Sequence, residues 1–146
     1  GTTKVNIIRR SADELGVDDP KEMREQEQTT SLIYEGVDDA DRVIGYAFVG
    51  EGNGYGGSVR VLVGVEEASD EILNVKVLEH TETPGLGSKI EDESFRKQFV
   101  GKKVEDPLKL GQDIDSISGA TVSSRAVTEA VRQGFDDATA IYRGGK

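Results

Sequence analysis

The amino-acid sequence predicts an α+β fold, an antiparallel β-sheet with a C-terminal helix and a short helix packed on it. Between residues 31 and 80, short runs rich in Val, Ile and Leu are separated by Asp and Gly clusters, which is typical of strands joined by turns. Around residue 95 and after residue 121, apolar residues recur every three or four positions. That spacing places them on one face of a helix.

Four strands are expected, in the segments 31–36, 39–52, 57–68 and 70–80. In the last of them, apolar residues alternate imperfectly with polar ones, as expected of strands with one face on a core and one in water. The connections are short, so consecutive strands should pair as an antiparallel meander. Residues 52–57, "GNGYGG", hold four glycines around one tyrosine and are predicted to form a loop.

Two helices follow the strands. Phe95 and Phe99 lie four residues apart and predict a short amphipathic helix closed by Gly101. The segment 121–146 predicts a longer helix that packs one stripe of side chains on the sheet. That stripe consists of Val127, Val131, Phe135 and Ala138, with Ala126 and Ala130 beside them.

The length of 146 residues fits a single domain, 1–146. Residues 1–28 are interpreted as a polar lead-in, in which 10–28 suit a solvated helix or a loosely packed segment. The formal charge of −10 opposes binding to nucleic acid or anionic lipid. The chain has no cysteine, which excludes disulfides and thiolate chemistry. Its longest apolar runs fall far short of the ~20 residues of a membrane-spanning helix.

Several common site types find no support. The Asp-rich stretches lack the Gly and Glu spacing of an EF-hand loop. The glycines of 52–57 precede a predicted strand rather than a helix, so they do not form a dinucleotide-binding fingerprint. His80 is the only histidine and is assigned no catalytic role. We therefore expect neither a metal site nor catalytic residues.

Residues 115–121, "DSISGAT", lie immediately before the last predicted helix. A helix start exposes backbone N–H groups without acceptors and the positive end of the helix dipole, so a phosphate binds there favourably. Gly119 and Ala120 leave the approach free of bulk. Ser118 and Thr121 offer hydroxyls either as helix caps or as phosphate partners. Capping is the commoner use of such residues, and the motif alone leaves both alternatives open.

"DSISGAT" followed by "VSS" resembles the signature of the FMN-binding domains in the G subunit of Rnf electron-transport complexes and the C subunit of sodium-pumping NADH:quinone oxidoreductase. The segment 77–90, "VLEHTETPGLGSKI", is similar to the His-x-Glu-Thr-Pro-Gly-Leu-Gly segment of this family, and 54–57 resembles its glycine-rich element. The three motifs occur in the family's order between residues 54 and 125. The match is closer to the Rnf G subunit.

The resemblance implies that Thr121 carries FMN through a phosphoester bond, attached by a flavin transferase that uses FAD. Ser118, Gly119 and Ala120 would complete the phosphate site. In the second motif, the backbone would face the edge of the flavin ring, Leu86 would pack on the face of the ring, and Glu82 and Thr83 would supply polar side-chain contacts. Gly87 is also expected at the binding site. Taken alone, this motif is equally consistent with a Pro-Gly turn that ends a strand. An esterified hydroxyl must be reachable by the modifying enzyme, so we expect Thr121 at the surface.

The implied function is electron relay within a membrane-bound, ion-translocating redox complex, in which this domain is an electron carrier and not a complete enzyme. The resemblance also implies a membrane anchor upstream, an extracytoplasmic position and other subunits as partners. A host without the transferase would yield the domain without FMN. Two alternatives are an FMN domain of a stand-alone flavin reductase and a flavin-less sensory or interaction module linked to the membrane.

Overall fold

The computed structural model describes residues 4–9 and 32–144. In this part of the chain, one antiparallel sheet has its strands in the order of the sequence. They are β1 (Lys4–Arg9), β2 (Leu32–Val37), β3 (Val43–Asn53), β4 (Ser58–Glu66) and β5 (Ile72–Glu79). The predicted fold class and the meander of four strands, β2–β5, are confirmed.

Strand β1 corrects the interpretation of residues 1–28 as a polar lead-in. It pairs with β2, with Lys4 opposite Val37 and Arg9 opposite Leu32. Its sequence, KVNIIR, holds three apolar residues, but the strand forms only through pairing with a segment more than 20 residues away. Such non-local pairing leaves little trace in a local pattern. Residues 10–28 lie outside the described part.

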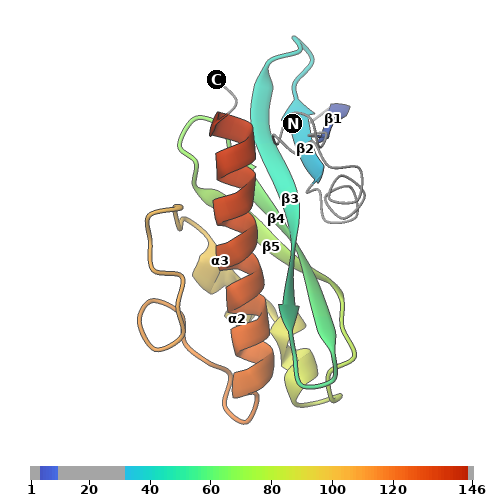
Figure 1. Ribbon diagram of the computed structural model, residues 1–146, viewed down its shortest axis with the longest axis vertical. Helices are drawn as coiled ribbons and strands as arrows, with labels where there is room; N and C mark the ends of the chain where they lie inside the picture. Colours follow the sequence, from blue (N-terminus) through green and yellow to red (C-terminus); the bar gives the residue numbers. More distant parts are fainter. Residues whose placement is uncertain (1–3, 10–31, 145–146) are drawn as a thin grey trace, which may run out of the picture.

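Helix α3 (Thr121–Gly144) runs along one face of the sheet (Figure 1). The predicted stripe faces the sheet, and all six of its residues are buried. The helix approaches β3 closely at two glycines: a Cβ at Gly50 would overlap the carbonyl oxygen of Ala130, and one at Gly52 that of Ala126. The middle of α3 is therefore fixed on the sheet by backbone contact that larger residues would prevent.

The predicted short helix is present but divided. The 3₁₀ helix η1 (Gly87–Glu91) precedes the α-helical turn α2 (Glu93–Arg96), which continues into a second 3₁₀ helix, η2 (Lys97–Phe99). Phe95 and Phe99 are buried with ring centroids 5.7 Å apart, and Gly101 ends the segment with φ 85°. No helix in the described ranges has the length and apolar character that crossing a membrane requires.

Three loops meet at one end of the sheet, the lower end in Figure 1. They are the β3–β4 hairpin loop, the segment after β5 and the segment that leads into α3. Each contains one of the sequence motifs described above, at 54–57, 80–87 and 115–121. The meander and the helix thus bring together motifs that lie far apart in the sequence.

Candidate functional site

The segment before α3 turns sharply at Gly119, whose φ of 79° lies in the left-handed region that glycine adopts without strain. The Ala120 N–H donates to the Ile117 carbonyl at 3.0 Å, and the Ala120 carbonyl accepts the Ser124 N–H at 2.9 Å. Ala120 therefore occupies the N-cap position. Alanine has no side-chain acceptor and is a poor cap.

The first turn of α3 is left with free donors. Within the described residues, no protein group accepts a hydrogen bond from the N–H of Thr121, Val122 or Ser123. The Ser118 side chain is exposed and makes no hydrogen bond there, and the Thr121 hydroxyl contacts only that of Ser116, at 3.3 Å. The capping alternative is therefore wrong for both residues. The donors and the positive end of the helix dipole remain available to an anion.

The Thr121 side chain is exposed, as its expected modification requires. Its loop is held in place from two sides. Ser124 Oγ accepts the Ile117 N–H at 2.9 Å and donates to the Ala120 carbonyl at 2.8 Å. Gln98, in η2, holds the start of the loop: Oε1 accepts the Asp115 N–H at 2.7 Å and Nε2 donates to the Asp115 carbonyl at 3.1 Å.

The segment after β5 forms a compact turn. The Thr83 carbonyl accepts the N–H groups of Leu86 and Ser88, both at 3.1 Å. Gly87 is buried, and a Cβ there would lie 2.5 Å from Ser123 Oγ and 2.8 Å from Glu82 Cβ. Glycine at this position therefore lets the turn pack directly against the start of α3.

Glu82 links the three motifs and does not lie where the sequence predicted. Its side chain is 5% exposed and is absent from the cavity lining. Oε1 accepts the Tyr55 N–H at 2.7 Å and the Ser123 hydroxyl at 2.6 Å, and Oε2 accepts the Gly56 N–H at 2.7 Å. Both oxygens are thus engaged inside the protein. Glu82 supports the site from behind and makes no direct polar contact in the cavity, which corrects our expectation.

The pKa of Glu82 reflects two opposing effects. Burial raises it, whereas the hydrogen bonds from Ser123, Gly56 and Tyr55 and the nearby His80 lower it, and the lowering effects are larger. The pKa of the Glu82 carboxyl is therefore held below its ordinary value, and the group is ionised at neutral pH. His80 supports the same turn, because its Nδ1 accepts the Glu82 N–H at 3.1 Å.

These segments enclose a cavity of about 570 Å³ beside the free donors. Three of its lining side chains are large, mainly apolar and exposed: Tyr55 is 81%, Leu86 52% and Val122 43% exposed. The cavity is lined by Tyr55, Thr83, Leu86, Gly87, Gly119, Ala120, Thr121, Val122 and Ser123. Apolar walls beside a few convergent polar groups are characteristic of small-molecule sites.

The sequence prediction and the lining agree in part. Six of the eight predicted residues line the cavity, whereas Glu82 and Ser118 do not. Tyr55, Val122 and Ser123 were missed. Tyr55 carried a signal, since it is the one aromatic residue within a glycine-rich loop. Val122 and Ser123 belong to the "VSS" stretch that follows "DSISGAT" in the signature. The hydrogen bond of Ser123 to Glu82 left no local signal, because it spans 41 residues.

The fold and the site define a class: an α+β domain with a cavity that suits a small molecule with an apolar body and an anionic group. The sequence model of the FMN-binding domain matches residues 54–136, a range that contains all three motifs at the site. The chain belongs to the FMN-binding domain family.

Two relatives have similar sequences. The G subunit of an ion-translocating oxidoreductase complex from Methanosarcina acetivorans is 39% identical over 107 residues, 72% of this chain and 57% of the relative. The G subunit of the proton-translocating ferredoxin:NAD(+) oxidoreductase complex from Clostridium ljungdahlii is 36% identical over 112 residues, 73% of this chain and 59% of the relative. The chain thus spans less than two thirds of the length of these relatives.

Solved structures share the fold. NqrC from Shewanella oneidensis matches with a TM-score of 0.73 at 20% identity, over 98% of this chain and 84% of that one. The C subunit of the Na(+)-translocating NADH-quinone reductase from Parabacteroides distasonis matches with a TM-score of 0.65 at 20% identity, over 94% and 76%. At this identity the likeness concerns the fold alone.

Proposed function

We propose that this domain carries one FMN through a phosphoester bond to Thr121 Oγ1 and serves as an electron carrier. The observation that carries the proposal is the exposed Thr121 hydroxyl beside three backbone N–H groups that have no acceptor in the described part of the chain. A phosphate attached there gains hydrogen-bond donors and a favourable helix dipole together. The donors would otherwise remain without a protein partner.

The cavity fits the rest of the cofactor. Its volume of about 570 Å³ lies within the ~300–1,000 Å³ usual for ligand sites. Leu86 and Val122 offer apolar contact for the flavin ring, and the exposed Tyr55 ring is an aromatic surface beside them. Thr83 adds a polar side chain to the lining. An open cavity with free donors supports a flavin carrier over a module that has lost its ligand.

The proposed attachment is a phosphoryl-group transfer catalysed by a separate flavin transferase. The Thr121 oxygen forms a bond to the flavin-side phosphorus of FAD, the bond from that phosphorus to the bridging oxygen breaks, and AMP leaves. The hydroxyl proton passes to a base of the transferase. The chain's own part is to present Thr121 at the surface on a loop that Gln98 and Ser124 hold in place.

Bound FMN would supply one- and two-electron chemistry. The protein would hold the ring, keep one of its faces against apolar side chains and set the charge around it. We assign no catalytic residue to this domain. The domain would therefore exchange electrons with partner proteins and catalyse no complete reaction alone.

The relatives point to a place for this carrier. They are named as G subunits of ion-translocating oxidoreductase complexes, one of them acting between ferredoxin and NAD(+). We infer that this chain is the flavin-carrying part of a similar membrane complex, anchored upstream and placed on the extracytoplasmic side. The other subunits of that complex would be its electron partners.

The test is the intact mass of the protein co-expressed with a flavin transferase and measured under denaturing conditions. We expect one FMN on the wild type, one on Thr121→Ser, which keeps a hydroxyl, and none on Thr121→Ala. Ser116→Ala, which removes the neighbouring hydroxyl, is the matched control and should retain the flavin. Attachment that persists in Thr121→Ala would refute the proposed linkage.

A further inference from the structure

Glu82 is distinctive among the carboxylates of this acidic chain. It is the only Asp or Glu buried within the described residues. No Lys or Arg of that part forms an ion pair with it, and its charge is offset by three hydrogen-bond donors and by the nearby His80. The charge is therefore fixed in place and poorly screened by water.

The charge lies directly behind the cavity wall. Two of its three hydrogen-bond donors belong to residues that line the cavity, the Tyr55 N–H and the Ser123 hydroxyl. The carboxylate is thus one hydrogen bond away from two residues of the cavity wall. The other acidic groups at this end of the sheet differ in exposure; the Glu79 side chain, for example, is 68% exposed.

We propose that Glu82 lowers the reduction potential of the flavin through its fixed negative charge, in addition to holding the wall of the site. This inference rests on the proposed function. Each electron that enters the ring adds negative charge unless a proton follows it. A nearby buried carboxylate opposes that charge more strongly than an exposed one, because less water lies between them. Glu82 is thus a positioning residue with an electrostatic effect.

The test compares flavin-loaded variants in one redox buffer of fixed potential, with the ratio of reduced to oxidised flavin read from absorbance. Glu82→Gln keeps the size of the side chain and removes its charge. We expect the ratio to rise about tenfold, which corresponds to about 30 mV for a two-electron couple. Glu79→Gln, the matched control, removes an exposed charge three residues earlier and should change the ratio less than about twofold.

A second variant separates charge from loosening of the site. Ser123→Ala keeps the carboxylate but removes one donor that offsets its charge. We therefore expect the ratio to fall by about twofold, opposite in direction to Glu82→Gln. Simple loosening would expose the ring to water in both variants and shift the ratio in the same direction. Ser123→Ala also tests the inference if Glu82→Gln does not fold.

The inference is overturned if Glu82→Gln leaves the ratio unchanged or lowers it, or if Ser123→Ala raises it. In each of these cases the proposed function still holds, provided that the wild type carries FMN on Thr121. Loss of the proposed function looks different, because the wild type would then show no attached FMN by mass. That result removes the basis of the inference as well.

Discussion

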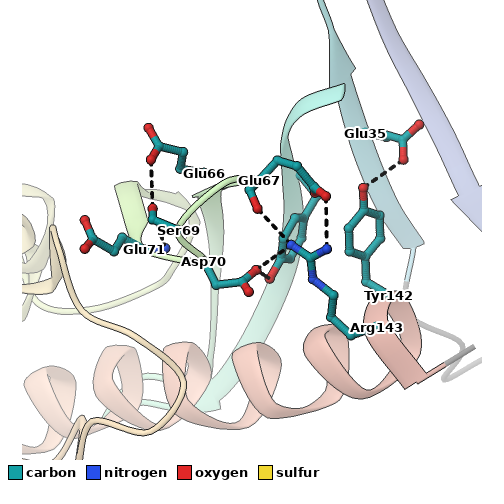
Figure 2. Close-up of polar contacts among 9 residues, drawn as sticks. Glu35, Glu66, Glu67, Ser69, Asp70, Glu71, Tyr142 and Arg143 are labelled. Carbon is teal, nitrogen blue, oxygen red and sulfur yellow. Dashed lines mark hydrogen bonds and ion pairs between the residues drawn. The ribbon is translucent and has the colours of Figure 1, made fainter. Parts of the chain in front are cut away.

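The two ends of helix α3 are built in opposite ways. At its C-terminal end, Tyr142 and Arg143 bond to side chains from the sheet and its loops (Figure 2). At its start, the N–H groups of residues 121–123 have no protein acceptor in the described part. The helix has 24 residues, so the two ends lie about 36 Å apart. One end is closed by the fold and the other is open to a ligand.

The closed end is a network around Arg143. Its guanidinium donates to the Glu67 side chain at 2.9 Å and to Asp70 at 2.8 Å, and it lies over the rings of Tyr46 and Tyr142. Those two rings stack with centroids 4.4 Å apart. A cation in the last turn also suits the negative end of the helix dipole. The network fixes the helix far from the site.

The comparison explains how the site can leave donors unpaired. Close packing on Gly50 and Gly52 and the network at Arg143 hold α3 without help from its first turn. The unpaired N–H groups in the first turn lower the stability of the helix, and the contacts of the rest of the helix offset that loss. Substitutions at the closed end should therefore destabilise the domain more than substitutions of exposed residues in the first turns of the same helix.

Arg143→Leu should lower the free energy of unfolding by about 1–3 kcal/mol, because it leaves Glu67 and Asp70 without their cationic partner in a half-buried network. Urea denaturation followed by circular dichroism measures the loss. Arg125→Leu is the matched control in the second turn of the same helix. Arg125 is exposed and has no hydrogen bond or ion pair in the described part, so we expect a change within about 0.5 kcal/mol. Equal losses of stability in the two variants would contradict the conclusion that the network at Arg143 holds the helix.

The two tyrosines at the closed end should also make the domain less stable at alkaline pH. Burial raises the pKa of Tyr46 from 10.0 to about 12, and burial together with Glu35 and Glu67 raises that of Tyr142 as well. The folded state therefore keeps phenol protons that the unfolded chain loses, so stability falls as the pH rises from about 10 to about 12. Denaturation midpoints across this range should show the fall.

Tyr46→Phe keeps the stacked ring and removes the titrating hydroxyl. Its stability should depend less on pH above 10 than that of the wild type. Tyr55→Phe, at the open end, is the matched control, because the Tyr55 ring is 81% exposed. The prediction is contradicted if the stability of Tyr46→Phe falls above pH 10 as steeply as that of the wild type while that of Tyr55→Phe does not. The alkaline sensitivity would then come from the open end of the helix.

The same contrast separates what the sequence could predict from what it could not. The stripe of α3 and the alternation in β5 are local patterns, and both were predicted. Exposure of Thr121 followed from the chemistry of attachment. The supporting position of Glu82 could not be predicted, because its hydrogen-bond partners lie 26 to 41 residues away in the sequence. The network at Arg143 could not be predicted for the same reason, because Glu67 and Asp70 lie more than 70 residues away from it in the sequence.

The smallest effect concerns two serines near the open end. Ser124 is buried, accepts the Ile117 N–H and donates to the Ala120 carbonyl. Ser124→Ala leaves that N–H without a partner and should cost about 1 kcal/mol of stability. It should also slow flavin attachment, because the loop that presents Thr121 loses its internal bond.

Ser118→Ala is the matched control, since Ser118 is exposed and has no hydrogen bond within the described residues. Its stability should match the wild type to within a few tenths of a kcal/mol. A helix cap would behave differently, because replacing a capping serine by alanine costs about 0.5–2 kcal/mol. A loss of that size for Ser118→Ala would mean that the first turn of α3 is capped in solution, and the donors proposed for the phosphate would not be free.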